Sequence, residues 1–595
     1  MKKRVADIIV ETLINSGIDT CFMVVGGGAM YLDNALGIND GIKKIFNHHE
    51  QASSMAAEAY ARYSGRMAAV CVTSGPGATN AITGVMGAWQ DSLPMIVLSG
   101  QVRYEISVEK SGLDLRYRGI QEFEIIPSVK NMTKYAKKII NPLAIKKELK
   151  KAIFLANDGR RGPVWLDVPQ DIQSCVVEEN DLYQVDDIDF DKKKIDYSEL
   201  IELLNNSKRP CIVAGSGIRS ANVYNSFLCF LEKVKIPVLG GSFFADALYE
   251  EHNLYYGACG QIGPRTGNFI VQNADVILVL GNSMGFRLTG FNQDGFAKKA
   301  KIIMVDIDEN ESKKPGLRVF KYIKRDLRDF FDEINDLNIS IKANDEWIDY
   351  CNSLKLRFTP YESINNISYD ERVNSYYFWK IFSKYEEEDS ILALGNNSAN
   401  SSKLQIGIKK RNQRVLTNYT CGSMGYDLPA AIGAAIASNK KVYCMTGDGS
   451  IMMNLQELQT IKYYDLPINI VIFENGGYGA IRQTSNNFFS GFYVGCTKET
   501  GISFPDFAEV AKTFGFEYIK CSKNNELENS IKKLINSKNR VLLEVSQKYD
   551  DPITPKVMSR VGADGKLLTP SIQDMYPFIE EDELKELMIY EKDGN

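Results

Sequence analysis

Histidine is scarce in this chain, which has three histidines among 595 residues, and its eleven cysteines form neither a CxxC pair nor a regular spacing. This pattern argues against a zinc site and against a disulfide framework. Cysteines that are many, scattered and unpatterned are typical of reduced thiols in a cytoplasmic protein. We therefore expect a cytoplasmic location.

Long apolar runs and a strong net charge are also lacking. The longest run of small apolar residues, AAIGAAIA at 430–437, is far shorter than the ~20 residues that cross a bilayer. Asp7 and Glu11 interrupt the N-terminal segment where a signal peptide would need an apolar core. The formal charge is −5 and the lysines are spread along the chain, so no basic stripe marks a nucleic-acid surface. We expect small-molecule partners, with no membrane span and no nucleic acid.

Apolar strand-like runs alternate with helix-like stretches along most of the chain. Examples are MAAVCVTS, MIVLSG and VWLDVP near the start, RPCIVAGSGI, ADVILVLGNS and KIIMVDID in the middle, and KVYCMT and INIVIFE towards the end. This alternation predicts an α/β protein of three doubly wound parallel-sheet domains. We place the domains at 1–178, 190–337 and 370–550, followed by a tail at 551–595. We expect the acidic segment VVEENDLYQVDDIDFDKKK to be a linker between the first two domains.

The strongest motif lies in the third predicted domain. There KVYCMT is followed by a turn at GDGS, a helix at LQELQTIKYY and a second strand, INIVIFE, which ends just before Asn475. Because parallel strands bring their carboxyl ends to one edge of the sheet, Asp448 and Asn475 should lie close together. Their oxygens suit Mg²⁺ beside a phosphorylated ligand. Gly447 and Gly449 would let the backbone approach the phosphate, helped by the N–H groups that open the helix after Ser450. A lone GDG, however, is a common turn.

The 27-residue separation of Asp448 and Asn475 resembles the signature of thiamine diphosphate enzymes. GDGSIMMNLQELQTIKYYDLPINIVIFENGGYG and CGSMGYDLPAAIGAAIA resemble the large catalytic subunit of acetolactate synthase and related pyruvate-dependent carboligases, and the resemblance spans nearly the whole chain. It implies a pyrimidine-binding, a middle Rossmann-like and a diphosphate-binding domain. It also implies thiamine diphosphate and Mg²⁺, with the side chains of Asp448 and Asn475 and the backbone carbonyl of Gly477 as metal ligands.

The resemblance extends to the residues that would hold the bent cofactor. Met424 becomes the wedge beneath it, and the carbonyl of Gly422 accepts a hydrogen bond from its 4′-amino group. The alternative for Met424 is ordinary core packing. Further cofactor contacts implied by the resemblance are Gly26, Gly27, Gly447, Gly449, Ser450 and Tyr478. One departure from the family is Glu474, where its members commonly have asparagine.

Glu50, in the stretch HHEQAS, takes the catalytic acid–base part in this resemblance, hydrogen-bonding N1′ of the cofactor pyrimidine. Its alternative is an exposed glutamate at a helix start. His48 and His49 are neighbours, so on a helix they diverge by about 100° and cannot share a metal. We interpret both as partly buried polar residues. RGIQEF resembles the synthase segment whose glutamine lines the active site, which makes Gln121 a second catalytic candidate.

The function implied is decarboxylation of a 2-keto acid, pyruvate, with transfer of the two-carbon unit to a carbonyl acceptor. Simple decarboxylases of this fold carry a histidine pair downstream of the glutamate, and SGLDLRYRGIQEFEIIPSVKNMTKY has no histidine. Three alternatives stay open: a plain 2-keto-acid decarboxylase or oxidase, a non-catalytic binding subunit, and a carboligase for a larger acceptor such as a nucleotide-linked keto-sugar. The last rests on Thr484, which stands where many synthases have tryptophan, on nearby Arg482 as a donor to the acceptor, and on the segment PKVMSRVGADGKLLTPSIQDMYPF, which resembles such carboligases. The alternative for Thr484 is a catabolic-type acetolactate synthase.

Acetolactate synthases also bind FAD, mainly in the middle domain, and a homodimer or homotetramer forms their active sites at the subunit interface. Arg160 matches a flavin-contacting arginine, GACG at 257–260 lies where a glycine-rich contact is expected, and Asp306 ends the strand KIIMV. Asn282 and Ser283 depart from the family pattern, and the alternative is therefore a vestigial flavin pocket.

Overall fold

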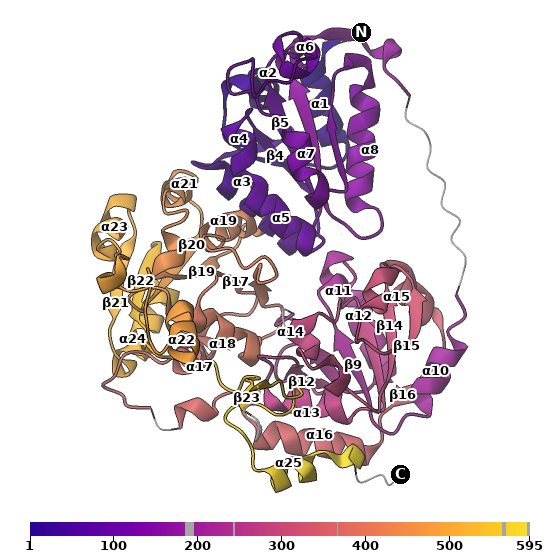
Figure 1. Ribbon diagram of the computed structural model, residues 1–595, viewed down its shortest axis with the longest axis vertical. Helices are drawn as coiled ribbons and strands as arrows, with labels where there is room; N and C mark the ends of the chain where they lie inside the picture. The colour runs from indigo at the N-terminus through magenta and orange to yellow at the C-terminus, as the bar shows by residue number, and fades with distance from the viewer. Residues whose placement is uncertain (185–194, 242–243, 366, 562–566, 592–595) are drawn as a thin grey trace.

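Three parallel six-stranded sheets, each flanked by helices, organise the chain in the computed structural model (Figure 1). The structure describes residues 1–184, 195–241, 244–365, 367–561 and 567–591. The predicted α/β class with three doubly wound domains is confirmed. Most of the predicted linker, residues 185–194, lies outside the described residues. Among the described residues, no helix is long and apolar enough to span a membrane.

The N-terminal sheet has the strand order β3, β2, β4, β5, β7, β6. These strands are Lys43–Phe46, Thr20–Met23, Ala68–Val72, Met95–Gln101, Pro163–Pro169 and Tyr135–Lys138. The chain moves to one side of β2 and then to the other, so the order reverses between β2 and β4. Helices α1 (Val5–Asn15), α3 (Glu50–Ser64) and α8 (Ile145–Asn157) pack on this sheet.

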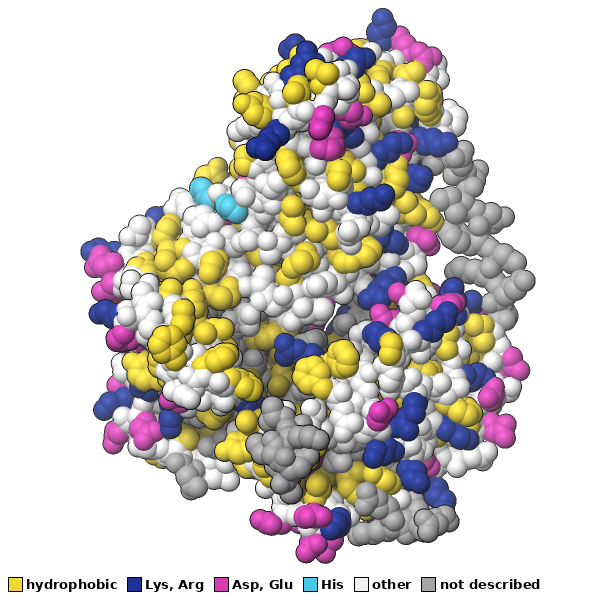
Figure 2. Space-filling view, in the orientation of Figure 1, with side chains coloured by type: hydrophobic (Ala, Val, Ile, Leu, Met, Phe, Trp, Pro, Cys, Tyr) yellow, Lys and Arg dark blue, Asp and Glu magenta, His cyan; other side chains and the backbone are white. Residues whose placement is uncertain are grey.

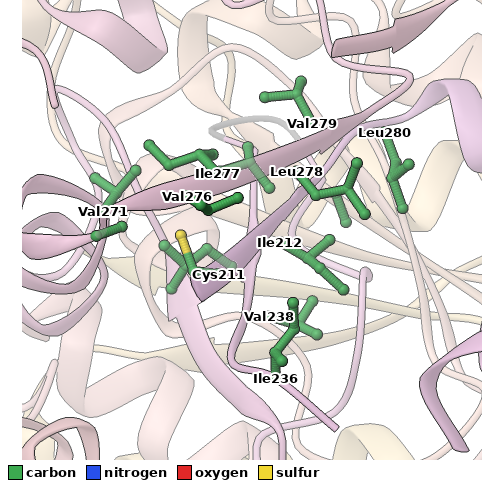
Figure 3. Packing of buried hydrophobic residues seen from close by; sticks show 14 of the residues in the cluster. Cys211, Ile212, Ile236, Val238, Val271, Val276, Ile277, Leu278, Val279 and Leu280 are labelled. Atoms are coloured by element: carbon green, nitrogen blue, oxygen red, sulfur yellow. The ribbon is translucent and has the colours of Figure 1, made fainter. Parts of the chain in front are cut away.

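The middle sheet has the order β12, β11, β9, β13, β14, β15. Its strands are Tyr255–Ala258, Val238–Gly240, Pro210–Ala214, Val276–Leu280, Lys301–Asp306 and Val319–Lys324. Figure 3 shows how Cys211 and Ile212 of β9 pack beside Ile277 and Leu278 of β13, all fully buried. Nearly continuous apolar strands of this kind are covered by helices on both faces.

The C-terminal sheet has the order β18, β17, β19, β20, β22, β21. Its strands are Arg414–Leu416, Ile391–Leu394, Val442–Gly447, Ile468–Glu474, Val541–Ser546 and Glu517–Cys521. Strands β19 and β20 are neighbours, with Gly447 opposite Phe473. The turn predicted at GDGS is absent, because β19 ends at Gly447 and helix α20 (Asp448–Ile451) begins at the next residue.

Helix packing joins the first and third domains. Helix α3 lies against α19 (Asp427–Ser438), where a Cβ on Gly433 would come within 2.1 Å of the Ala56 carbonyl oxygen. The Tyr426 hydroxyl, just before α19, donates to the Glu58 carboxylate at 2.6 Å. Only a glycine allows this close helix contact, which fixes the middle of α3 relative to the C-terminal domain.

The last described residues pack against the middle domain and do not extend the C-terminal sheet. Side-chain amides on α13 (Arg265–Asn273) capture carbonyls of this segment: Asn268 donates to Ile572 at 2.8 Å, and Asn273 donates to Leu587 at 3.0 Å. Figure 1 shows the terminal helix α25 (Glu581–Leu587) beside α16 (Asp345–Arg357).

Candidate active site

Asp448 begins helix α20 directly after β19, at the edge of the C-terminal sheet where the strand order reverses between β17 and β19. Its carboxylate accepts backbone N–H groups from Gly449 at 2.8 Å, Asn475 at 3.0 Å and Gly477 at 3.2 Å. Burial raises the pKa of Asp448 to about 6, although these bonds oppose the shift. The structure thus brings Asp448, Asn475 and Gly477 together. The strand arrangement predicted this proximity for Asp448 and Asn475, and the family resemblance implied Gly477.

Two polar side chains hold Asn475 in place. Its amide nitrogen donates to Gln547 Oε1 at 3.3 Å, and its backbone carbonyl accepts from Arg482 Nη2 at 2.9 Å. The same arginine nitrogen donates to the Tyr549 carbonyl at 3.2 Å. These contacts fix the amide plane and turn its oxygen away from Gln547. No local sequence pattern marks Gln547, because it follows a different strand and lies 72 residues from Asn475.

Glycine is required at two positions near Asp448, namely Gly477 and Gly449. Gly477 has φ +140°, and a Cβ there would lie 2.1 Å from the Cys496 carbonyl oxygen. At Gly449 a Cβ would lie 2.4 Å from the Tyr478 ring and 3.4 Å from the Met424 methyl group. Met424, Gly449 and Tyr478 are therefore neighbours, and Met424 is only partly buried, which distinguishes it from a core methionine.

The remaining C-terminal candidates lie around the same strand ends. The Ser450 hydroxyl donates to Asp427 at 2.5 Å and accepts from the Gly425 N–H at 2.9 Å, which fixes the loop that carries Met424. The Gly422 carbonyl accepts from the Asn396 side chain at 2.6 Å. Gly447 faces Asn397, whose Cβ would be 3.2 Å from a Cβ at that position. Asp427, which is fully buried, was missed by the sequence reasoning, although its place at the start of a helix after a glycine-rich loop could have indicated it.

The donor set at Asp448 suits a hard cation that a ligand helps to bind. In the described part of the chain, no group of three or more His, Cys, Asp or Glu side chains could hold a metal by itself. Around Asp448 the oxygens are one carboxylate, one amide and one backbone carbonyl, the types that Mg²⁺ takes when phosphate and water complete its shell. The buried carboxylate would also gain a compensating charge.

Glu474, which departs from the family pattern, pairs with Arg372. Its carboxylate forms an ion pair with Arg372 at 2.6 Å, and the same guanidinium donates to the Glu474 carbonyl at 2.7 Å. Arg372 also lies 4.2 Å from the centroid of the Tyr549 ring. Glu474 therefore anchors the end of β20 to the segment before α17 (Ser375–Tyr385).

Glu50 is the first residue of α3, whose N-cap is His49; the His49 ring nitrogen accepts the Gln51 N–H at 3.1 Å. The Asn80 amide donates to the Glu50 carboxylate at 3.0 Å. Asn80, which sequence reasoning missed, ends the short helix α4 (Pro76–Asn80), which begins within the SGPG stretch. Among the described residues, no hydrogen bond within one chain joins Glu50 to the Asp448 cluster.

The other N-terminal candidates lie in loops at the strand-order reversal of the first sheet. Gly26 follows β2, and a Cβ there would lie 2.5 Å from Thr73, which follows β4. Gly27 is exposed, with its carbonyl bonded to the Gln170 side chain. Gln121 is exposed with φ +58°, and its carbonyl oxygen would lie 2.5 Å from a Cβ on Gly75. The structure therefore brings Gln121 to the loop between β4 and α4.

Arg482 and Thr484 lie on different sides of helix α22 (Gly479–Phe488). The Arg482 side chain is buried against the Asn475 loop, while Thr484 is exposed and its hydroxyl donates back to the Ala480 carbonyl at 3.1 Å. Figure 2 shows hydrophobic side chains gathered over this part of the C-terminal domain. The exposed ones around α22 are Ile481, Phe488, Phe489, Phe492 and Val494.

A cavity of about 470 Å³ lies where all three domains meet, above the reversal between β9 and β13 of the middle sheet. Arg160 and Asp306 both line this cavity. Asn282 and Ser283, the two residues that depart from the family pattern, also line it. Arg160 bridges the domains through ion pairs to Asp308 at 3.0 Å and Glu311 at 2.7 Å. Burial raises the pKa of Asp306. The GACG segment at 257–260 is outside the lining.

Close backbone packing shapes the floor of this cavity. A Cβ on Gly215, after β9, would come within 2.0 Å of the Gly281 carbonyl oxygen, after β13. Loops after neighbouring parallel strands at a point of strand reversal are where doubly wound sheets bind nucleotides. The size, the glycines and the acidic strand end fit an extended dinucleotide.

Comparison with known proteins gives three family matches in chain order. Residues 3–121 match the N-terminal TPP binding domain of thiamine pyrophosphate enzymes, residues 197–330 match their central domain, and residues 394–545 match their C-terminal TPP binding domain. The chain is 30% identical to the acetolactate synthase large subunit of Lactococcus lactis, over 94% of this chain and 95% of that protein. It is 29% identical to acetolactate synthase 1, chloroplastic, of Zea mays (94% and 87% coverage) and to the probable acetolactate synthase large subunit of Methanococcus aeolicus (91% and 91%).

Proposed function

Because this chain belongs to the thiamine pyrophosphate enzyme family, we propose that it is a Mg²⁺-dependent carboligase similar to acetolactate synthase. Its donor substrate is pyruvate, which loses CO₂, and the two-carbon unit passes to a carbonyl acceptor. The observation that carries this proposal is the convergence of Asp448, Asn475 and Gly477 beside Met424 at one sheet edge. Thiamine diphosphate, when bound, supplies the carbanion chemistry that no side chain offers.

The residues of this chain would bind, orient and handle protons. The side chains of Asp448 and Asn475 and the carbonyl of Gly477 would hold Mg²⁺, and backbone N–H groups at the start of α20 would bind the diphosphate. Met424 and Tyr478 would support the cofactor. Glu50, oriented by Asn80 at 3.0 Å, holds the proton at the pyrimidine N1′. Gln121, beside the loop between β4 and α4, would contact the substrate.

A homodimer with active sites between subunits is part of the proposal. Glu50 and the Asp448 cluster have no hydrogen bond to each other among the described residues of one chain, and exposed apolar residues lie near the other N-terminal site candidates. Around Gln121 and Gly26 these are Val25, Leu113, Tyr117 and Ile120, with Ile120 88% exposed. Apolar surfaces of this kind mark association sites. We also propose a cytoplasmic location, supported by eleven cysteines that are all free thiols.

The acceptor is the open part of the proposal, and an exposed Thr484 favours a second candidate, a carboligase for a larger acceptor such as a nucleotide-linked keto-sugar. Replacing an indole by threonine removes a large apolar wall. The buried Arg482 adds less support, since its Nη2 already donates to the carbonyls of Asn475 and Tyr549.

Product analysis tests both candidates. With pyruvate alone, we expect acetolactate as the main product by mass spectrometry; aldehyde, acetate or peroxide would instead indicate a decarboxylase or oxidase. With candidate keto-sugar nucleotides added, a large-acceptor enzyme should divert most of its product to the mixed adduct. Rapid acetolactate formation that no added acceptor changes would remove the second candidate. The variant Thr484→Trp should suppress only the larger product.

We further propose that the cavity at the domain junction holds FAD. The purified protein should be yellow, with flavin absorbance near one equivalent per chain. The variant Arg160→Gln, which breaks the ion pairs to Asp308 and Glu311, should lose most of this absorbance, whereas Arg66→Gln, an exposed arginine of the same domain, should keep it. Colourless protein, even after dialysis against excess FAD, would mean that the changes at Asn282 and Ser283 have removed the flavin site.

A further inference from the structure

A second cavity, of about 660 Å³, lies between the middle and C-terminal domains. Its walls are helix α17, the segment before β18 and the loop after β11; a short parallel bridge between Tyr249 and Ile408 joins the two domains beside it. It shares no lining residue with the cavity at the domain junction and includes none of the active-site candidates. The lining residues are Tyr249, Glu251, Tyr361, Lys380, Ser383, Lys384, Glu388, Lys409, Lys410 and Arg411.

The lining carries more positive than negative charge, with five lysine or arginine side chains against two glutamates. Lys384 forms an ion pair with Glu528 at 3.1 Å, and Lys409 with Glu250. Lys380 and Arg411 face tyrosine rings instead, Lys380 at 5.9 Å from the Tyr361 centroid and Arg411 at 5.3 Å from the Tyr249 centroid.

Among the residues that the structure describes, neither Lys380 nor Arg411 forms an ion pair. A group of cations converging on a cavity therefore indicates a site for a negatively charged group, which they would bind through charge-assisted hydrogen bonds.

The Ser383 hydroxyl is an independent sign of a ligand. The side chain lines the cavity, is only 6% exposed, and its oxygen has no hydrogen-bond partner in the described part of the chain. An unsatisfied buried hydroxyl costs free energy, and such groups in native proteins usually have a partner. In this structure the oxygen has almost no accessible surface, so a rotation about χ1 would be needed to turn the hydroxyl into the cavity, where phosphate oxygens are strong acceptors.

We propose that this cavity binds a small metabolite carrying phosphate groups, at a site separate from the cofactor sites. Lys380 and Arg411 neutralise the phosphates together with Lys410, whose Nζ also donates to the Glu386 carbonyl. Ser383 donates to one of the phosphate oxygens after rotation of its side chain. The volume is that of an ordinary small-molecule site. Because the walls come from two domains, the bound ligand would fasten the middle domain to the C-terminal domain and stabilise that arrangement.

The test uses full-length protein saturated with thiamine diphosphate, Mg²⁺ and FAD, so that the other phosphate sites are filled. Inorganic pyrophosphate and ADP are titrated separately by calorimetry at constant free Mg²⁺. We expect saturable binding of at least one, weakened at least ~10-fold in a Lys380→Gln/Arg411→Gln double variant. The variant Ser383→Ala should weaken binding by less. A Lys498→Gln/Lys512→Gln variant removes two exposed charges of the C-terminal domain and should bind as the native protein does.

Comparing the two probes identifies the ligand class. Tighter binding of ADP means that Tyr249 or Tyr361 also contacts a base, whereas equal binding means that the phosphates alone are recognised. Two results would overturn the proposal: no saturable binding of either probe at millimolar concentration, or equal affinity in native protein and in a Lys380→Gln/Arg411→Gln variant whose thermal unfolding is unchanged.

Discussion

The variant Asp448→Ala is expected to lose Mg²⁺-dependent binding of thiamine diphosphate, with affinity at least ~100-fold weaker, and to lose activity with it. The change removes the only carboxylate of the proposed metal site and leaves the N–H groups of Gly449, Asn475 and Gly477 without their acceptor. Without a metal, the diphosphate charge is poorly compensated. Calorimetric titration of the cofactor in the presence of Mg²⁺ measures the effect.

Two further variants separate metal loss from damage to the fold. Asp448→Asn keeps an oxygen for the backbone donors, so its folding should be closer to native while its Mg²⁺ binding remains impaired. Asp465→Ala removes a side chain that is 93% exposed in the same domain and should leave cofactor affinity unchanged. Cofactor binding of native strength in folded Asp448→Ala would refute the metal assignment.

The variant Glu50→Gln is expected to bind thiamine diphosphate and Mg²⁺ normally but to turn over at least ~100-fold more slowly, the usual scale for losing a general acid–base group. Glutamine keeps the shape of the side chain and can still accept from Asn80, so the start of α3 should be undisturbed. Steady-state kinetics with pyruvate, read beside calorimetry of the cofactor, separates catalysis from binding.

Two comparisons make the Glu50 result specific. Glu105→Gln, an exposed glutamate in the same domain, should have native turnover. Asn80→Ala should lower turnover less than Glu50→Gln does, because it removes the partner of the carboxylate but not the carboxylate itself. Turnover close to native in Glu50→Gln would exclude an acid–base role.

The parts of the fold that the sequence predicted are those set by local pattern. The run VILVL is apolar at every position and INIVIFE is apolar except at Asn469 and Glu474, which is typical of parallel strands buried on both faces, and these runs form β13 and β20. The proximity of Asp448 and Asn475 followed from the same geometry, since neighbouring parallel strands end at one edge. The strand topology expected from the sequence was therefore enough to predict that Asp448 and Asn475 lie together.

What the sequence could not predict depends on contacts between distant segments. The ion pair of Glu474 with Arg372 joins positions 102 residues apart, so the role of Glu474 was not visible. Arg482 looked like a donor to the acceptor because it lies near Thr484, but the helix turns it inward against Asn475. The cavity lined by Lys380 and Arg411 required two domains to be placed side by side.

The most direct measurement is a calorimetric titration of the native protein with thiamine diphosphate, first with Mg²⁺ and then with the metal removed by EDTA. Convergence of Asp448, Asn475 and Gly477 on a metal that carries the diphosphate predicts saturable, stoichiometric binding with Mg²⁺ and at least ~100-fold weaker binding without it. Failure to bind thiamine diphosphate with Mg²⁺ present, or equal affinity in its absence, would contradict the proposed cofactor site.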